Sequence, residues 1–170
     1  EYNGLGHDSQ DGLYRVPFGA GTIRTTVTVR FRTFANDVTG VTARVWNTAV
    51  NAESMIPLTR VASNEDCRVA ALATDRCDYW QMQLHPTQRG VLYYRFIIVD
   101  GASTAYYADD GMFDGGWGTA TPDMLDRSYP IVVYEPNFAP IGWLQNGVMY
   151  QIFPDRFRNG SVANDPHNGD

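Results

Sequence analysis

Side-chain oxygens are concentrated near the C-terminal end of the 170-residue sequence. Asn159, Ser161, Asn164 and Asp165 lie within one short stretch that is rich in turn-forming residues. Hard cations such as calcium take about six to eight oxygen ligands, so these residue types at this spacing suit a calcium loop. Two other interpretations fit the same residues: a solvated polar tail, and a glycosylation sequon at Asn159-Gly160-Ser161.

Two cysteines, Cys67 and Cys77, lie ten positions apart. The sequence has no second Cys or His pair near them that would complete a zinc site. We expect a disulfide, which would stabilise the fold by about 3 kcal/mol and would persist in an oxidising compartment. The alternative is a pair of unbonded thiols on a loop.

The charged residues indicate a fold with few helices. All 13 basic residues are Arg, and the 19 acidic residues comprise 15 Asp and 4 Glu, beside 16 Gly and 9 Pro. Lys and Glu favour helices, whereas Asp favours turns and caps. The net charge of -6 and the absence of a basic cluster argue against nucleic acid and anionic membrane as partners.

The sequence contains no apolar run as long as the roughly 18 residues that a membrane span requires. It begins at Glu1 without a basic and apolar leader. We therefore expect that any export signal has been removed or was never part of this stretch.

Short alternating segments predict β-strands. Apolar and polar side chains alternate over residues 25–33, 41–46, 79–84 and 91–99, and shorter candidates lie at 54–57, 105–108 and 131–134. This period of two turns Val45 inward and Trp46 outward, and places Tyr93 and Arg95 together on an outer face. Turn clusters, for example at 36–40 and 63–66, separate the strands. An all-β fold follows, an antiparallel immunoglobulin-like β-sandwich.

The character of the sequence changes after residue 136. Residues 137–146 have the composition of an extended linker, and the run GVMYQIFPDRF that begins at Gly147 is nearly continuously apolar, as in a strand of a buried parallel sheet. A parallel strand needs a crossover and a partner strand, and neither follows. We expect a sandwich domain at 1–136, a linker at 137–146, and the opening of a second domain at 147–170.

Two groups of motifs carry a resemblance to a known family. WLQNGVMYQIFPDRFRNG, residues 143–160, resembles the first barrel strand of the alpha-amylase superfamily (glycoside hydrolase family 13), in particular neopullulanases, cyclomaltodextrinases and related alpha-amylases. NGLGHD, RFRTFANDVTGVTARVWNTAVN, DYW and YYRFIIVDGASTAYY resemble the N-terminal β-sandwich of the same enzymes, grouped as carbohydrate-binding module family 34. The resemblance implies that residues 147–170 hold the first strand and calcium-type loop of a truncated (β/α)8 catalytic barrel.

Catalysis is not expected from this stretch. Retaining glycosidases use two carboxyl groups about 5 to 5.5 Å apart, and in the resembling family these acids lie on later barrel strands, which no position here matches. Asp155 follows the expected barrel strand, but one carboxylate cannot carry a double displacement, and we expect it to pair with Arg156 or Arg158. The chain alone is therefore predicted to be inactive.

The resemblance also implies two calcium sites. Similar enzymes bind calcium with a loop N-G-D-x-x-N-D after the first barrel strand, and here Ser161 replaces the first Asp, which removes a charged ligand. A second site in the sandwich of some relatives uses acids that match Asp37 and Asp100. Both of these are also ordinary turn residues.

Sugar recognition rests on aromatic rings that stack on pyranose faces, with polar groups nearby. Trp46 is the leading candidate because strand alternation turns it outward. Trp117, in the loop DDGMFDGGWG, is second, and Tyr93 and Tyr107 follow. A domain interface and an unoccupied surface position are the alternatives for Trp46.

Together these inferences predict an extracellular, starch-associated module that binds or positions α-glucan for a hydrolase acting on starch, pullulan or related polymers. The alternative is an interface domain that binds no sugar and instead packs on the barrel or mediates homodimerisation.

Overall fold

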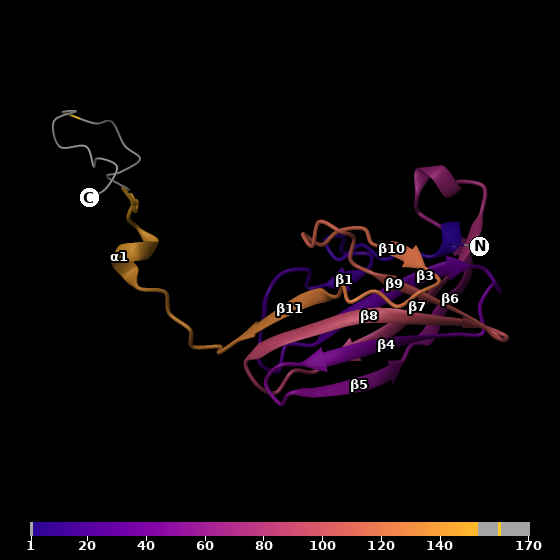
Figure 1. The fold of residues 1–170 in the computed structure, drawn as a ribbon, viewed down its shortest axis with the longest axis horizontal. Helices are drawn as coiled ribbons and strands as arrows, with labels where there is room; N and C mark the ends of the chain where they lie inside the picture. Colours follow the sequence, from indigo (N-terminus) through magenta and orange to yellow (C-terminus); the bar gives the residue numbers. More distant parts are fainter. Residues whose placement is uncertain (1, 153–159, 161–170) are drawn as a thin grey trace, which may run out of the picture. The chain divides into compact units, whose positions relative to one another are not determined.

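The alternating segments of the sequence form the strands of the protein. The computed structural model describes residues 2–152 and residue 160, and its strands lie in the first of two units, Glu1–Pro136 and Asn137–Asp170 (Figure 1). The described part of the second unit contains a short helix, α1 (Gly142–Gln145). Across the described residues, no helix combines the length and the apolar character that a bilayer crossing needs.

A four-stranded sheet forms one layer of the first unit. Its order is β1-β3-β7-β6, with β1 (Arg15–Val16), β3 (Val27–Phe34), β7 (Arg76–Leu84) and β6 (Thr59–Asp66). All of its pairs are antiparallel, and β3 and β7 pair from Val27 opposite Leu84 to Phe34 opposite Cys77. Long pairing of two alternating strands gives this sheet one continuous apolar face.

A seven-stranded sheet forms the other layer, with β8 (Gly90–Asp100) at its centre. β4 (Gly40–Asn47) pairs with β8 and also with β5 (Ala52–Pro57). β11 (Tyr129–Tyr134) pairs with the first half of β8, and β9 (Ser103–Ala108) pairs with the second half. β10 (Thr119–Thr121) extends the sheet beyond β9, and β2 (Gly21–Thr22) runs parallel to β11.

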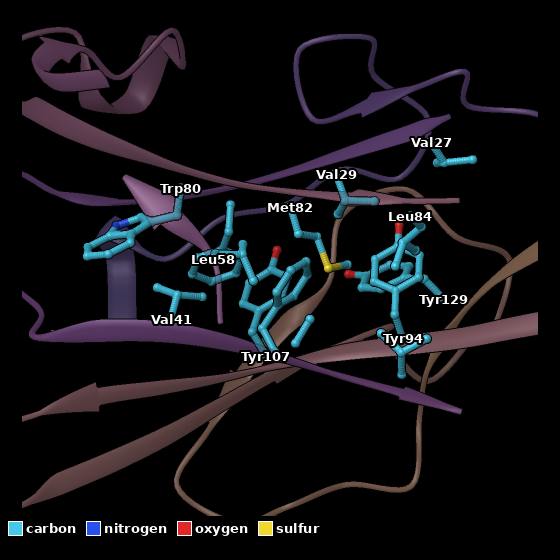
Figure 2. Close-up of a cluster of buried hydrophobic side chains, with 14 of the residues drawn as sticks. Val27, Val29, Val41, Leu58, Trp80, Met82, Leu84, Tyr94, Tyr107 and Tyr129 are labelled. Atoms are coloured by element: carbon cyan, nitrogen blue, oxygen red, sulfur yellow. The ribbon is translucent and has the colours of Figure 1, made fainter. Parts of the chain in front are cut away.

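The core lies between the two sheets. Side chains from both layers point into the space between the sheets in Figure 2, with Val29 and Met82 coming from the four-stranded sheet and Val41 and Tyr94 from the other. Phe31 and Phe96 bring the layers together with ring centroids 4.6 Å apart. These contacts confirm the predicted antiparallel sandwich, because the residues that alternation assigns to inward faces are all buried.

β6 differs from the expected turn at residues 63–66. The strand continues to Asp66, with register shifts on either side of Ala62. The buried Asp78 carboxylate holds the irregular part, because it accepts hydrogen bonds from Asn64 N (3.0 Å) and from the Ser63 hydroxyl (2.9 Å). An almost fully exposed strand of this kind has no buried face and hence no alternation in its sequence.

The expected barrel strand falls largely outside the described residues. Over 147–152 the described chain forms neither helix nor strand. Residues 153–157 of the run lie outside the described residues, and so do Asp155, Arg156 and Arg158. The barrel assignment of this segment stays a prediction.

A disulfide between Cys67 and Cys77 ties the end of β6 to β7. Both cysteines are buried in a small second cluster with Tyr14 and Tyr79. The covalent bond closes a short loop next to the edge strand β6. The end of this strand has one hydrogen-bonded neighbour in the sheet, and the disulfide holds it more firmly to β7.

His7 is fully enclosed by the core. Its Nδ1 donates to the carbonyl of Arg30 at 2.7 Å, since a carbonyl can only accept, and its Nε2 therefore accepts from the Tyr94 hydroxyl at 2.9 Å. Burial lowers the pKa of His7 from 6.5 to about 3, against the opposing effect of the Arg30 carbonyl. The imidazole is neutral in the folded protein at neutral pH.

This neutral histidine predicts loss of stability in mild acid. Below pH 6.5 the unfolded chain takes up a proton on His7, whereas the folded chain does so only near pH 3. Protonation of His7 in the unfolded chain should lower the free energy of unfolding by roughly 4 to 5 kcal/mol as the pH falls from 6.5 to 3. Above pH 6.5 this part of the stability is fully present. Urea unfolding at several pH values measures it.

His7→Gln is the matched variant, because its amide can donate to the Arg30 carbonyl and accept from Tyr94 but does not titrate. Its free energy of unfolding should depend much less on pH between 4.5 and 6.5. Parallel pH profiles for the two proteins would contradict the assignment. Asp109, whose pKa is raised by burial, acts in the opposite direction and is present in both proteins.

Candidate functional site

Two aromatic residues of the sugar-binding prediction lie opposite each other on the outer face of the seven-stranded sheet. Trp46 of β4 and Tyr93 of β8 are directly opposite each other across the strand pair. Their neighbours Val45 and Tyr94 point into the core, so alternation turns both rings outward. Opposed residues of antiparallel strands have neighbouring side chains, and because both rings line one cleft we call them its aromatic floor.

The floor lies in a cleft of about 390 Å³. Its walls come from the connections around β10: Phe113 from the segment before it, and Asp126 and Ser128 from the segment after it. Tyr93 is 38% exposed and Phe113 is 62% exposed, so ring surface faces the cleft. The positive φ of Phe113 (59°) shows that the tight loop, and not a strand, orients this residue.

Arg44 supplies a positive charge beside the floor. Its guanidinium lies 5.7 Å from the centroid of the Trp46 ring, and its Nε donates to the Glu53 carboxylate at 2.5 Å. The cation thus occupies part of the indole surface while its charge is balanced by Glu53 of the neighbouring strand. The cleft offers a fixed aromatic surface with donors and acceptors at its edge.

This arrangement suits binding more than acid-base chemistry. Among the described residues that line the cleft, Asp126 is the one carboxylate. The Asp126 side chain is open to solvent. Hydrolysis with retention needs a pair of carboxyl groups, whereas recognition of a neutral sugar needs aromatic faces and a few polar groups, which this cleft provides.

Trp117 lies in a different place. Its ring is edge-on to Tyr14 with centroids 5.4 Å apart, and the Arg32 guanidinium lies 5.6 Å from its centroid. It lines a separate cavity of about 590 Å³ together with residues such as Leu72. Trp117 is 43% exposed but does not contribute to the floor formed by Trp46 and Tyr93.

The structure contradicts the sugar-binding prediction for Tyr107. It is 3% exposed and points into the core in Figure 2. Its hydroxyl donates to the carbonyl of His7 at 3.1 Å and accepts from Gly118 N at 3.0 Å. Because its ring packs against Phe31 and its hydroxyl is fully engaged, it offers no face to a sugar.

Asp37 and Asp100 line one cavity of about 210 Å³ with the hydroxyl residues Ser103 and Thr104. The donor set is composed of oxygen, which suits a hard cation. The described residues contain no group of three or more His, Cys, Asp or Glu side chains placed to hold a metal ion together. Calcium at this pair stays a prediction. The other loop, with Asn159, Ser161, Asn164 and Asp165, lies outside the described residues.

Phe113, Asp126 and Ser128 are the cleft residues that sequence reasoning does not identify. Phe113 shares a Gly- and Asp-rich loop with Trp117, and its position four residues earlier is the nearest signal in the sequence. Asp126 and Ser128 lie in an irregular segment and become neighbours of Trp46 only through folding.

Comparisons with known proteins agree with this architecture. Amylopullulanase from Thermoanaerobacterium saccharolyticum is 36% identical over 167 residues, which cover 96% of this chain and 12% of the relative. Cyclomaltodextrinase from Bacillus sp. is 32% identical over 146 residues, which cover 84% of this chain and 23% of the relative. The chain therefore spans between 12% and 23% of the length of these two curated relatives.

A solved structure of a cyclomaltodextrinase shares the fold, with a TM-score of 0.55 and 23% identity over 96% of this chain and 25% of that chain. The expectation of an extracellular protein is wrong. A relative from Bacillus subtilis (strain 168), 29% identical over 107 residues that cover 63% of this chain and 18% of the relative, is named intracellular maltogenic amylase. A sandwich of this family is therefore no sign of secretion.

The resemblance to the N-terminal sandwich of these enzymes is confirmed. Residues 21–129, more than half of the chain, match the family described as "Alpha amylase, N-terminal ig-like domain". The chain belongs to this family of N-terminal immunoglobulin-like domains of alpha-amylases.

Proposed function

We propose that the cleft over Trp46 and Tyr93 binds α-glucan chains, such as those of starch or pullulan, for a larger hydrolase of the alpha-amylase superfamily. The observation that carries the proposal is the cross-strand pair of outward aromatic rings in one cleft with Phe113. Rings held by neighbouring strands are rigid, so a sugar that stacks on them loses little affinity to ordering of the protein.

The chemistry of the cleft favours a neutral ligand. The protein carries a net charge of -6, and the charge of Arg44 is already balanced by Glu53. Asp126 and Ser128 can exchange hydrogen bonds with hydroxyl groups at the edge of a stacked pyranose. A polyhydroxylated ring with an apolar face meets both requirements.

The names of the relatives support the choice of ligand. Amylopullulanase and cyclomaltodextrinase are named for α-glucan substrates, and both contain a stretch similar to this chain. We assign cleavage of the glucosidic bond, with retention, to the larger protein. The cleft itself is proposed to bind the glucan only.

Trp46→Ala should weaken binding of maltoheptaose by about tenfold, a loss of about 1.4 kcal/mol, because it removes half of the aromatic floor. Isothermal titration calorimetry with the folded chain measures this change. Trp117→Ala is the matched control, since it removes another half-exposed Trp at a separate cavity. Its affinity should stay within about twofold of wild type.

Equal losses in the two Trp variants would place the sugar elsewhere or show a nonspecific effect. An interface role makes a different prediction: the chain would self-associate with increasing concentration in sedimentation velocity, Trp46→Ala would abolish that association, and maltoheptaose would not bind.

The chain alone should release no reducing sugar from starch or pullulan. The physical reason is that the binding cleft provides one exposed carboxylate in place of a catalytic pair. A reducing-sugar assay at high protein concentration measures this, and turnover by the purified chain would refute the proposal of a binding role without catalysis.

A further inference from the structure

Arg95 lies on β8, two residues after Tyr93 and therefore on the same outer face of the strand. Directly opposite it on β4 is Arg44, the residue that covers part of the Trp46 ring. Alternation predicts an outward, solvated side chain at this position. Instead Arg95 is 6% exposed, because the segment between β10 and β11 lies over it.

The guanidinium of Arg95 contacts three consecutive residues of that segment. Its Nη1 donates to the carbonyl of Leu125 at 2.5 Å and lies 3.6 Å from a carboxylate oxygen of Asp126. Its Nη2 contacts the sulfur of Met124 at 3.3 Å. Residues 122–128 form neither helix nor strand in the described chain, so side-chain contacts of this kind hold the segment against the sheet.

The held segment is a wall of the cleft. Asp126 and Ser128 line the cleft, and the guanidinium of the intervening Arg127 lies 5.9 Å from the ring centroid of Phe113 on the other wall. A shift of residues 124–126 would therefore move Asp126 and Ser128 on one wall and disturb Phe113 on the other. The aromatic floor would stay in place, because it belongs to the strands.

Packing alone does not require an arginine here. Burial, reinforced by the charge of Arg44, lowers the pKa of Arg95, and its Nε has no hydrogen-bond partner. An apolar side chain of similar length would fill the space without burying a charge. What the guanidinium adds is a directed contact with a specific stretch of backbone.

We propose that Arg95 is a positioning residue of the α-glucan cleft, which fixes residues 124–128 so that Asp126 and Ser128 meet a sugar stacked on Trp46 and Tyr93. This inference rests on the proposed function. Pre-organisation of the wall is what Arg95 contributes, since it touches the wall and not the ligand.

The test compares Arg95→Met, Arg95→Lys and the control Arg30→Met. Arg30, on β3 of the other sheet, also makes two side-chain hydrogen bonds, to Gln81 and to the Leu13 carbonyl. Maltoheptaose binding is measured by calorimetry at one common temperature, about 15 °C below the lowest melting temperature in the set, so that every sample is folded. Hydrogen exchange of residues 122–128 is followed in the same samples without sugar.

Arg95→Met should weaken binding by about tenfold and speed exchange in 122–128, whereas Arg30→Met should change neither by more than about twofold. Arg95→Lys keeps the charge and one donor group, so its affinity should recover to within about threefold of wild type. The partial rescue separates positioning from a simple loss of stability.

Two results distinguish the failure of this inference from that of the proposed function. If Trp46→Ala weakens binding and Arg95→Met does not, or if exchange in 122–128 is unchanged by Arg95→Met, the positioning role is wrong and the cleft remains the binding site. If wild-type protein does not bind maltoheptaose, the proposed function fails and the positioning role fails with it.

Discussion

The packing of β8 against the opposite sheet constrains the rest of the molecule. Tyr94 and Phe96 are fully buried between the layers, each worth about 2 to 3 kcal/mol of apolar burial. A slip of one residue would expose both rings and drive Arg95 into the core. The same constraint therefore fixes the direction of Tyr93, so the floor of the cleft is held in place by the core of the sandwich.

The inward faces of β3, β4, β7 and β8 were predictable from the sequence, and the burial of those residues confirms them. Alternation also predicted correctly that Trp46 and Tyr93 point outward. Their direct opposition depends on the register between two strands far apart in the sequence. Periodicity within one strand contains no information about that register, so the pair could not be identified before folding.

Alternation fails where the residues on both faces are alike. In β9 the adjacent Tyr106 and Tyr107 give no polar residue to mark the outer face, and the register opposite Phe96 is what turns Tyr107 inward. β6 fails for the opposite reason, because its residues are nearly all polar and exposed. Phe113 and Asp126 come from irregular segments whose positions follow from tertiary contacts alone. Membership of a family shows the sandwich but not which of its aromatic residues share a cleft.

The cleft combines a floor made of strands with walls made of the connections around β10. Insertions and substitutions in those connections leave the paired strands and their buried side chains untouched. A change in the length of these two connections would therefore reshape the walls of the cleft while the sandwich keeps folding as before. A strand residue such as Arg95 limits that freedom, since each new wall must still accept its guanidinium.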